Sequence, residues 1–162
     1  MAAQSLVNLA RTFWMDEAGF ARQHAHPWFV WKVGRPSEAP IVAPTLTIGG
    51  DQNKPRSGDP IAIPILKGKA SVFAMGITIG RTENNDVVLR HEEVSRFHAY
   101  VQEASGVLNL VDADSKNGTW VNGLRLMASK PQPLPPTASI KFGQLQITYY
   151  DNAAFIDFLR NP

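Results

Sequence analysis

Apolar residues recur along this chain with two different periods. Near the N-terminus they recur at helical spacing, at Leu6, Leu9, Ala10, Phe13, Phe20 and Ala21. This spacing predicts a helix over residues 5–22, with Ser5 available as its N-cap. The apolar stripe fits either of two roles, docking on the protein's own core or forming a surface for a partner or a second copy. Residues 153–160, AAFIDFLR, predict a second, short amphipathic helix.

From Val72 onward the period changes to that of β-strands. Short apolar runs follow one another at 72–80, 86–89, 97–104, 107–113, 119–126 and 139–151. The dipeptides Ser105-Gly106 and Asn122-Gly123 are hairpin turn signals, and the last run bends near Gly143. Strands at such regular, short spacing predict a β-sandwich or barrel.

Two more strands are predicted before this region. Pro27 ends any helix, and WFVWKV (28–33) is apolar on both faces, as in a buried strand. IAIPIL (61–66) is predicted to be an edge strand because Pro64 has no N–H for a ladder. Residues 34–60 between them are rich in Gly, Pro and polar residues and predict a long loop around one short strand, PTLTIGG.

Composition narrows the class of protein. The 162 residues are 44% hydrophobic, which suits one domain with a small appendage. A net charge of +2 gives no case for nucleic acid, and no apolar run approaches the roughly 20 residues of a membrane span. Charged residues from Arg11 onward leave no room for a signal-peptide core, so we expect a cytoplasmic protein without membrane insertion.

Metal and cofactor chemistry has no support in the sequence. The chain has no cysteine, which excludes disulfides and thiolate metal sites. The four histidines, His24, His26, His91 and His98, match no metal-ligand pattern. No phosphate-binding glycine fingerprint of a nucleotide or dinucleotide site is present. We therefore expect neither a metal nor a cofactor.

The polar stretch GRTENNDVVLRHEEVSRFH (80–98) carries the first candidate chemistry. Gly80 ends an apolar strand, and the guanidinium of Arg81 can hold two phosphate oxygens at once. Alternatively, Arg81 is a surface residue that pairs with Glu83 or Asp86. Asn85 and Asp86 are predicted to shape the turn that aims Arg81, because Asn and Asp readily bond to nearby backbone.

The end of this stretch, SRFH, offers Ser95 as a hydroxyl donor and Arg96 as a second cation. Ser with His also raises the question of a nucleophile and base. No third member and no nucleophile elbow accompany them, so we expect His98 to be a buried, hydrogen-bonded support. We do not expect an enzyme.

A second polar loop, DSKNGTWVNG (114–123), carries the remaining candidates. Lys116 adds a third cation, and the amide of Asn117 can both donate and accept, as a clamp on a peptide main chain requires. Residues 117–119 also match a glycosylation sequon, which we take as incidental.

The order Gly-Arg, Asn-Asp, Ser-x-x-His and Asn-Gly resembles the forkhead-associated (FHA) domain. The resemblance is close over residues 76–126 and extends over 61–150 with the flanking strands. It implies an all-β fold, an FHA-type (SMAD/FHA-like) β-sandwich of about eleven strands, here with short helices at both termini. The expected organisation is an N-terminal helical extension (1–25), a first strand and long loop (26–60), the sandwich (61–150) and a C-terminal helix or tail (151–162).

The resemblance also implies a role for each motif residue. Arg81, Ser95, Arg96 and Lys116 are similar to the residues that bind the phosphate of a phosphothreonine, and Asn117 is similar to the one that holds the ligand's main chain. The supporting positions are Gly80, Asn85, Asp86, His98 and Gly118. Glu92, Glu93, Asp112 and Asp114 lie near these motifs, and Glu93 is expected to favour basic or neutral ligand residues.

The implied function is a phosphothreonine-peptide binding module in Ser/Thr kinase signalling or kinase-regulated assembly. Its partner would be a phosphothreonine-containing protein, such as a kinase or a kinase substrate. The alternative is a scaffold of the same fold that binds proteins without regard to phosphate, through the N-terminal helix or the 34–60 loop.

Overall fold

Two β-sheets, in which all strand pairs except β4 with β5 are antiparallel, form the body of the protein. The computed structural model describes residues 3–32, 60–68, 73–74 and 76–161. One sheet has seven strands in the order β1-β3-β2-β12-β11-β8-β9, and the other has five in the order β10-β7-β6-β4-β5. The prediction of an all-β sandwich is therefore confirmed, with twelve strands in the described ranges. The strands are β1 Gln4–Ser5, β2 Trp28–Trp31, β3 Ile61–Pro64, β4 Ile77–Gly80, β5 Val87–Val88, β6 Ala99–Ala104, β7 Val107–Asp112, β8 Thr119–Val121, β9 Leu124–Arg125, β10 Gln132–Pro133, β11 Thr137–Phe142 and β12 Leu145–Tyr150.

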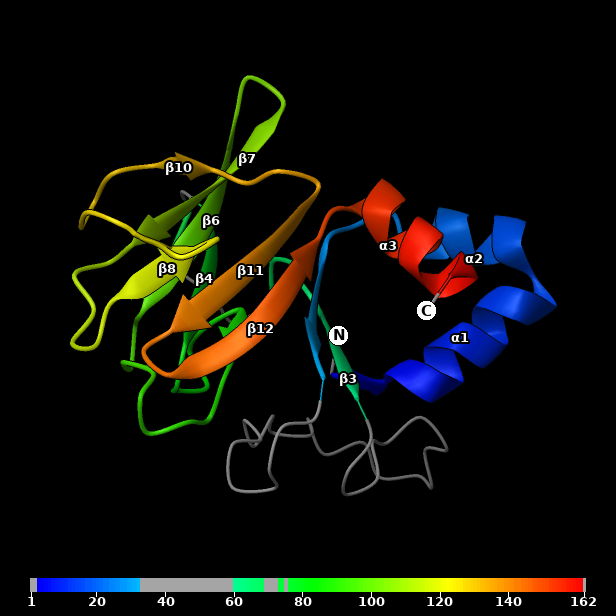
Figure 1. The fold of residues 1–162 in the computed structure, drawn as a ribbon, viewed down its shortest axis with the longest axis horizontal. Coiled ribbons are helices and arrows are strands. Elements are labelled where there is room, and N and C mark those ends of the chain that lie inside the picture. The colour runs from blue at the N-terminus through cyan, green and yellow to red at the C-terminus, as the bar shows by residue number, and fades with distance from the viewer. Residues whose placement is uncertain (1–2, 33–59, 69–72, 75, 162) are drawn as a thin grey trace.

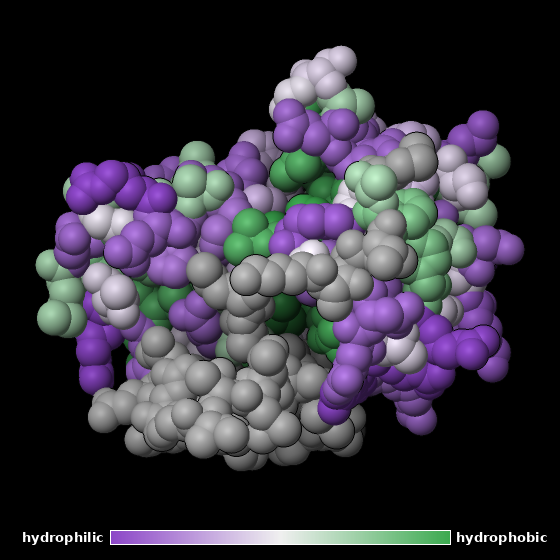
Figure 2. Space-filling model, turned by 180° about the vertical axis from the view of Figure 1, so that it is seen from behind, coloured by the Kyte–Doolittle hydropathy of each residue, from purple (hydrophilic) through white to green (hydrophobic). Residues whose placement is uncertain are grey.

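The sandwich core follows from the alternation along its strands. In β11, Ala138, Ile140 and Phe142 are buried, while the residues between them are more exposed. β12 pairs with β11 and alternates in the same way, so the two strands line one wall of the core. Seen from behind, most of the described surface is hydrophilic, and hydrophobic residues occupy a smaller area over the sandwich (Figure 2).

Both predicted hairpin turns form with left-handed backbone. Ser105 and Gly106, which join β6 to β7, have φ of 53° and 76°, and Asn122 and Gly123, which join β8 to β9, have 50° and 82°. Two consecutive positive φ values match the type I′ turn, whose twist suits a two-residue hairpin. The bend at Gly143 likewise joins β11 to β12, with φ of 62°.

The N-terminal helical region divides into two helices where we expected one. These are α1 (Leu6–Met15) and α2 (Glu17–Gln23), and Asp16 between them has φ of −152°. The Asp16 carboxylate accepts a hydrogen bond from the Gly19 N–H at 2.8 Å and so begins a new helix. Ser5 lies at the N-cap position of α1 but makes no side-chain cap bond. The predicted C-terminal helix is α3 (Asn152–Arg160), capped by Asp151.

The three helices lie together on one side of the sandwich, against β2, β3 and β12 (Figure 1). Trp28 of β2 stacks on Phe155 of α3, with ring centroids 4.8 Å apart. The buried residues of this second core are Leu6, Leu9, Phe13, Phe20, Trp28, Val30, Ala62, Phe155, Ile156 and Leu159. Of the two roles open to the N-terminal stripe, docking on the protein's own core is the one observed. β2 is buried on both faces, as predicted, because the sandwich core lies on one side of it and the helices on the other.

The edge prediction for β3 is wrong. β3 lies between β1 and β2, because Gln4 and Ser5 pair with Ala62 and Ile61 just before α1 begins. Pro64 lies beyond this two-residue ladder and is opposite Trp28. The predicted loop at 34–60, except for Pro60, and its short strand PTLTIGG lie outside the described residues. In the part of the chain that is described, no helix is both long and apolar enough to cross a membrane.

Candidate functional site

Gly80 and Arg81 stand at the end of β4, where the chain leaves the sheet. A Cβ at Gly80 would lie 2.2 Å from the Arg96 carbonyl oxygen and 2.6 Å from the Asn85 amide nitrogen, so only glycine fits there. The Arg81 N–H donates to the Ser95 carbonyl at 2.9 Å. These contacts join the loop after β4 to the loop before β6 and leave the Arg81 side chain exposed.

Asn85 fastens the same two loops to each other. Its amide nitrogen donates to the Thr82 carbonyl at 2.9 Å and to the Arg96 carbonyl at 2.7 Å. Because these bonds span both loops, Asn85 fixes the separation between the backbones that carry Arg81 and Arg96.

Asp86 supports the sheet rather than this turn. Its carboxylate accepts hydrogen bonds from the Thr78 N–H at 2.7 Å and the Gly68 N–H at 2.6 Å, and it pairs with Lys67 at 3.2 Å. Burial of the carboxylate would raise the pKa of Asp86, but these hydrogen bonds outweigh it and hold the pKa below its usual value. Asp86 therefore anchors β4 to residues 67 and 68.

His98 links three segments behind the loops. It is fully buried; its Nδ1 accepts from the Ser95 N–H at 2.9 Å, and its Nε2 lies 3.1 Å from the Gly118 carbonyl. A backbone N–H can only donate, so the imidazole is neutral, with its proton on Nε2 directed at Gly118. Burial lowers the pKa of His98 and favours this neutral form.

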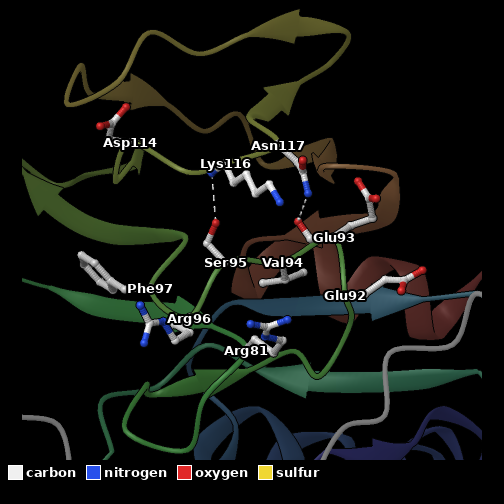
Figure 3. A pocket seen from close by; sticks show the side chains of 10 residues that line it. All are labelled: Arg81, Glu92, Glu93, Val94, Ser95, Arg96, Phe97, Asp114, Lys116 and Asn117. Carbon is white, nitrogen blue, oxygen red and sulfur yellow. Dashed lines mark hydrogen bonds between the residues drawn. The ribbon is translucent and has the colours of Figure 1, made fainter.

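The loop between β7 and β8 completes the arrangement. The Lys116 N–H donates to the Ser95 hydroxyl at 3.0 Å, and the Asn117 amide nitrogen donates to the Glu93 carbonyl at 3.0 Å (Figure 3). The Ser95 hydroxyl keeps its own hydrogen, and the Asn117 amide keeps its oxygen and a second N–H. Both residues are thus held in place and still have groups free for a ligand.

Asp112 shapes this loop from inside. Its carboxylate accepts from the Ser115 N–H at 3.0 Å, the Ser115 hydroxyl at 2.6 Å and the Thr119 hydroxyl. Asp112 is buried by these partners and is not on the pocket wall, although we had grouped it with the acidic residues near the motifs. Gly118 has φ of 85°, which only glycine adopts easily.

An open pocket of about 540 Å³ lies among these loops. In Figure 3, Arg81 and Arg96 lie below Ser95, and Lys116 and Asn117 lie above it. Five predicted ligand-binding residues thus meet in one pocket, namely Arg81, Ser95, Arg96, Lys116 and Asn117. The predicted supporting residues Gly80, Asn85, His98 and Gly118 do not line the pocket but contact the loops that form it, whereas Asp86 bonds to Thr78 of β4 and to Gly68.

Five further residues complete the lining of this pocket, namely Glu92, Glu93, Val94, Phe97 and Asp114. Val94 is buried and Phe97 is 40% exposed at the rim, and neither stood out in the sequence. Gly143, from the β11–β12 turn, was also missed as a site residue. A Cβ there would lie 2.7 Å from a Glu93 carboxylate oxygen and 3.1 Å from the Asn117 Cβ.

The charges in this pocket do not neutralise one another. Within the described segments, no carboxylate lies within 4.0 Å of the charged nitrogens of Arg81, Arg96 or Lys116. Some other cations of the described residues are paired: Arg90 binds Glu83, and Lys67 binds Asp86. The two carboxylates that might have paired with Arg81 are therefore engaged elsewhere. Cations that are gathered and unpaired form a ready anion site. No group of three or more potential metal ligands occurs in the described part.

Part of the chain matches a known protein family. The family model of the FHA domain matches residues 77–143. No curated protein sequence gives a significant match.

Several solved structures are similar to this chain. Mycobacterium tuberculosis EmbR in complex with a low-affinity phosphopeptide is 21% identical, with a TM-score of 0.48 and coverage of 78% of this chain and 24% of that one. Rad53 1-466 in complex with AMP-PNP is 29% identical (TM-score 0.44; 59% and 26% covered). The N-terminal FHA domain of S. cerevisiae Rad53p with a phosphothreonine peptide is 27% identical (TM-score 0.42; 50% and 71% covered).

The present chain spans about a quarter of the length of the first two of these chains. The family match runs from the first residue of β4 to the glycine after β11, and it includes every residue that lines the pocket. Residues 77–143 therefore match the FHA domain family, as the motifs predicted, and every residue that lines the pocket lies within this match.

Proposed function

We propose that this protein is a phosphothreonine-peptide binding module and that the pocket at the loops is its binding site. The observation that carries the proposal is the group of three cations, Arg81, Arg96 and Lys116, which line one pocket with Ser95 and form no ion pair among the described residues. The bound structures of EmbR and of the Rad53p FHA domain contain a phosphopeptide and a phosphothreonine peptide, respectively, which supports the same ligand class here.

The chemistry of a phosphate matches this group. A phosphothreonine carries about −1.5 to −2 charge at neutral pH and three strong acceptor oxygens. Arg81 offers a planar pair of donors, the Ser95 hydroxyl offers one more, and Arg96 and Lys116 add positive charge. Hydrogen bonds to charged groups contribute about 1.5–3 kcal/mol each. A few of them supply much of the roughly 8 kcal/mol of a micromolar complex, before the cost of ordering the peptide.

The ligand's main chain would be held by Asn117. Its amide oxygen and second N–H can accept from and donate to one peptide unit of the ligand. Because the Asn117 amide is already fixed by the Glu93 carbonyl, this clamp loses little conformational freedom on binding.

The proposal includes a cellular setting. A module that reads phosphothreonine serves Ser/Thr kinase signalling or a kinase-regulated assembly, and its partner is a kinase or a kinase substrate. Such signalling places the protein in the cytoplasm. The proposed action is binding alone, because both nitrogens of His98 are bonded to backbone and the imidazole is not available as a base for Ser95.

The first test compares two arginine variants against a phosphothreonine peptide library. Arg81→Ala is expected to weaken binding at least about tenfold, since one charge-assisted contact is lost. Arg90→Ala is the matched control, because Arg90 belongs to the same loop region but pairs with Glu83 and does not line the pocket. Equal affinities of Arg81→Ala and wild type would refute the site assignment.

Threonine preference is tested with the same peptides. The resemblance to FHA domains implies that phosphoserine versions bind more weakly than phosphothreonine versions. Equal affinity for both would remove the threonine preference and leave phosphate recognition intact.

A second candidate function is a scaffold that ignores phosphate. One observation favours it: α1 exposes Val7, Trp14 and Met15, with 53%, 64% and 82% of their surface accessible. A partner that binds wild type and Arg81→Ala equally, but loses affinity with Trp14→Ala, would support this function instead.

A further inference from the structure

Three carboxylates share the pocket with the three cations, yet the two sets remain apart. Among the described residues, Glu92, Glu93 and Asp114 form no ion pair, although each lines the same pocket as Arg81. If these carboxylates served to neutralise the site, they would pair with the arginines, as Glu83 does with Arg90. Free carboxylates beside a free anion site form a second, oppositely charged subsite.

The carboxylates are not spread evenly around the pocket. In Figure 3, Glu92 and Glu93 lie on the side of Asn117, whereas Asp114 lies on the opposite side, with Arg96 and Phe97. Two negative charges thus stand together next to the residue that would hold the ligand's main chain. A ligand residue near that clamp is more strongly affected by Glu92 and Glu93 than by Asp114.

Glu93 is held in this position by its neighbours. Its backbone carbonyl accepts from the Asn117 amide, and its side chain lies over Gly143, where a Cβ would come within 2.7 Å of the carboxylate. The Glu93 side chain is half-buried, whereas Glu92 beside it is exposed. The pair therefore combines one ordered carboxylate with one that is free to adapt to its ligand.

We infer that the pocket selects phosphothreonine peptides with a lysine or arginine beside the phosphothreonine, on the side where Glu92 and Glu93 lie. This inference rests on the proposed function and adds the charge of the flanking sequence to it. The phosphate is bound by the three cations and Ser95, and the basic side chain of the peptide by the two glutamates. An acidic residue at that position faces two like charges and is rejected.

The test uses oriented phosphothreonine libraries, in which one flanking position at a time is fixed as Lys, Ala or Glu. At one or more positions on a single side of the phosphothreonine, Lys is expected to bind about three- to tenfold more tightly than Glu. Glu92→Gln and Glu93→Gln should each reduce this ratio, and Glu92→Lys should bring it to one or below. The matched control is Glu103→Gln, which removes the same charge from an exposed site on β6 outside the pocket and should leave the ratio unchanged.

The outcomes separate this inference from the proposed function. If all libraries bind alike, or if Glu is preferred, the pocket still binds phosphothreonine but the inference is wrong. A lysine preference that survives Glu92→Gln, Glu93→Gln and Glu92→Lys, or that disappears with Asp114→Asn alone, also overturns it. If wild type retains no phosphothreonine library at all, the proposed function fails, and the inference fails with it.

Discussion

At the scale of single residues, most of the motif residues fix the backbone, and five of them line the pocket. Gly80, Asn85 and His98 hold the three loops together through bonds to main-chain atoms. Arg81 and Lys116 then need only project from loops that are already in place. Rigid support of this kind lowers the entropy lost on binding, which is why motif residues without ligand contacts matter.

Gly80 provides a direct test of this support. Gly80→Ala puts a methyl group against the Arg96 carbonyl and the Asn85 amide, so the two loops must separate. We expect a loss of about 1–3 kcal/mol in the free energy of unfolding, measured with urea, together with weaker peptide binding. Unchanged stability would show that the loops are not locked at this point.

His98 makes stability depend on pH. The folded protein keeps His98 neutral because its pKa is lowered by burial, whereas in the unfolded chain it takes up a proton near its ordinary pKa of 6.5. The free energy of unfolding should therefore be steady above pH 6.5, fall as the pH drops below 6.5, and level off below the folded-state pKa.

Urea titrations between pH 7.5 and 5 test this dependence. His98→Gln should flatten the decline and leave a smaller slope from His24 and His26, whose pKa values burial also lowers. An identical slope in His98→Gln would contradict the assigned neutral state of His98.

At the scale of elements, the terminal helices share a buried core with the seven-stranded sheet. α1, α2 and α3 bury one apolar core against the outer face of β2, β3 and β12. The exposed side of α1 also carries apolar residues, namely Val7, Trp14 and Met15. Helical spacing nevertheless identified the inner face, because the predicted stripe contains the buried Leu6, Leu9 and Phe13.

Phe13 and Trp14 are neighbours in the sequence but lie on the buried and the exposed face of α1, respectively. Phe13 is fully buried, whereas Trp14 is 64% exposed. Phe13→Ala should cost about 3–5 kcal/mol of unfolding free energy, and Trp14→Ala should change it by less than about 0.5 kcal/mol. Urea titration of the two variants checks this, and comparable losses would contradict the docking of α1 that is described above.

Local signals in the sequence were sufficient for most strands and for five of the residues that line the pocket. Positive φ at Asn122 and Gly123 follows from the residue types themselves, and the site residues lie in short motifs. The break at Asp16 was missed because helical period continues across it, while a side-chain cap restarts the helix. β1 was missed since two residues carry no period, and their pairing with β3 is a long-range contact.

The acidic half of the pocket was predictable only in part. Glu93 was singled out from its position beside the motif, but Asp112 was grouped with it although it faces inward. Which acids face the pocket depends on loop conformation. Gly143, which makes room for Glu93, comes from a turn 50 residues further along the chain. A pattern of neighbouring residues in the sequence cannot reveal a contact between positions so far apart.

At the scale of the whole molecule, the helical core and the pocket are built from different residues. The helices cover one side of the seven-stranded sheet, and the pocket is formed by loops of the matched FHA region. Substitutions in the helical core should therefore change stability, while substitutions in the pocket should change binding with little effect on stability.

The most direct test of the central claim is calorimetric titration of wild type with one peptide in two forms, phosphorylated and unphosphorylated at a single threonine. The peptide is the tightest one selected from the phosphothreonine library. From the three cations of the pocket, we predict that removal of the phosphate weakens binding at least about a hundredfold, as expected for the loss of two charge-assisted contacts. Equal affinity for the two forms would contradict phosphate recognition by this pocket.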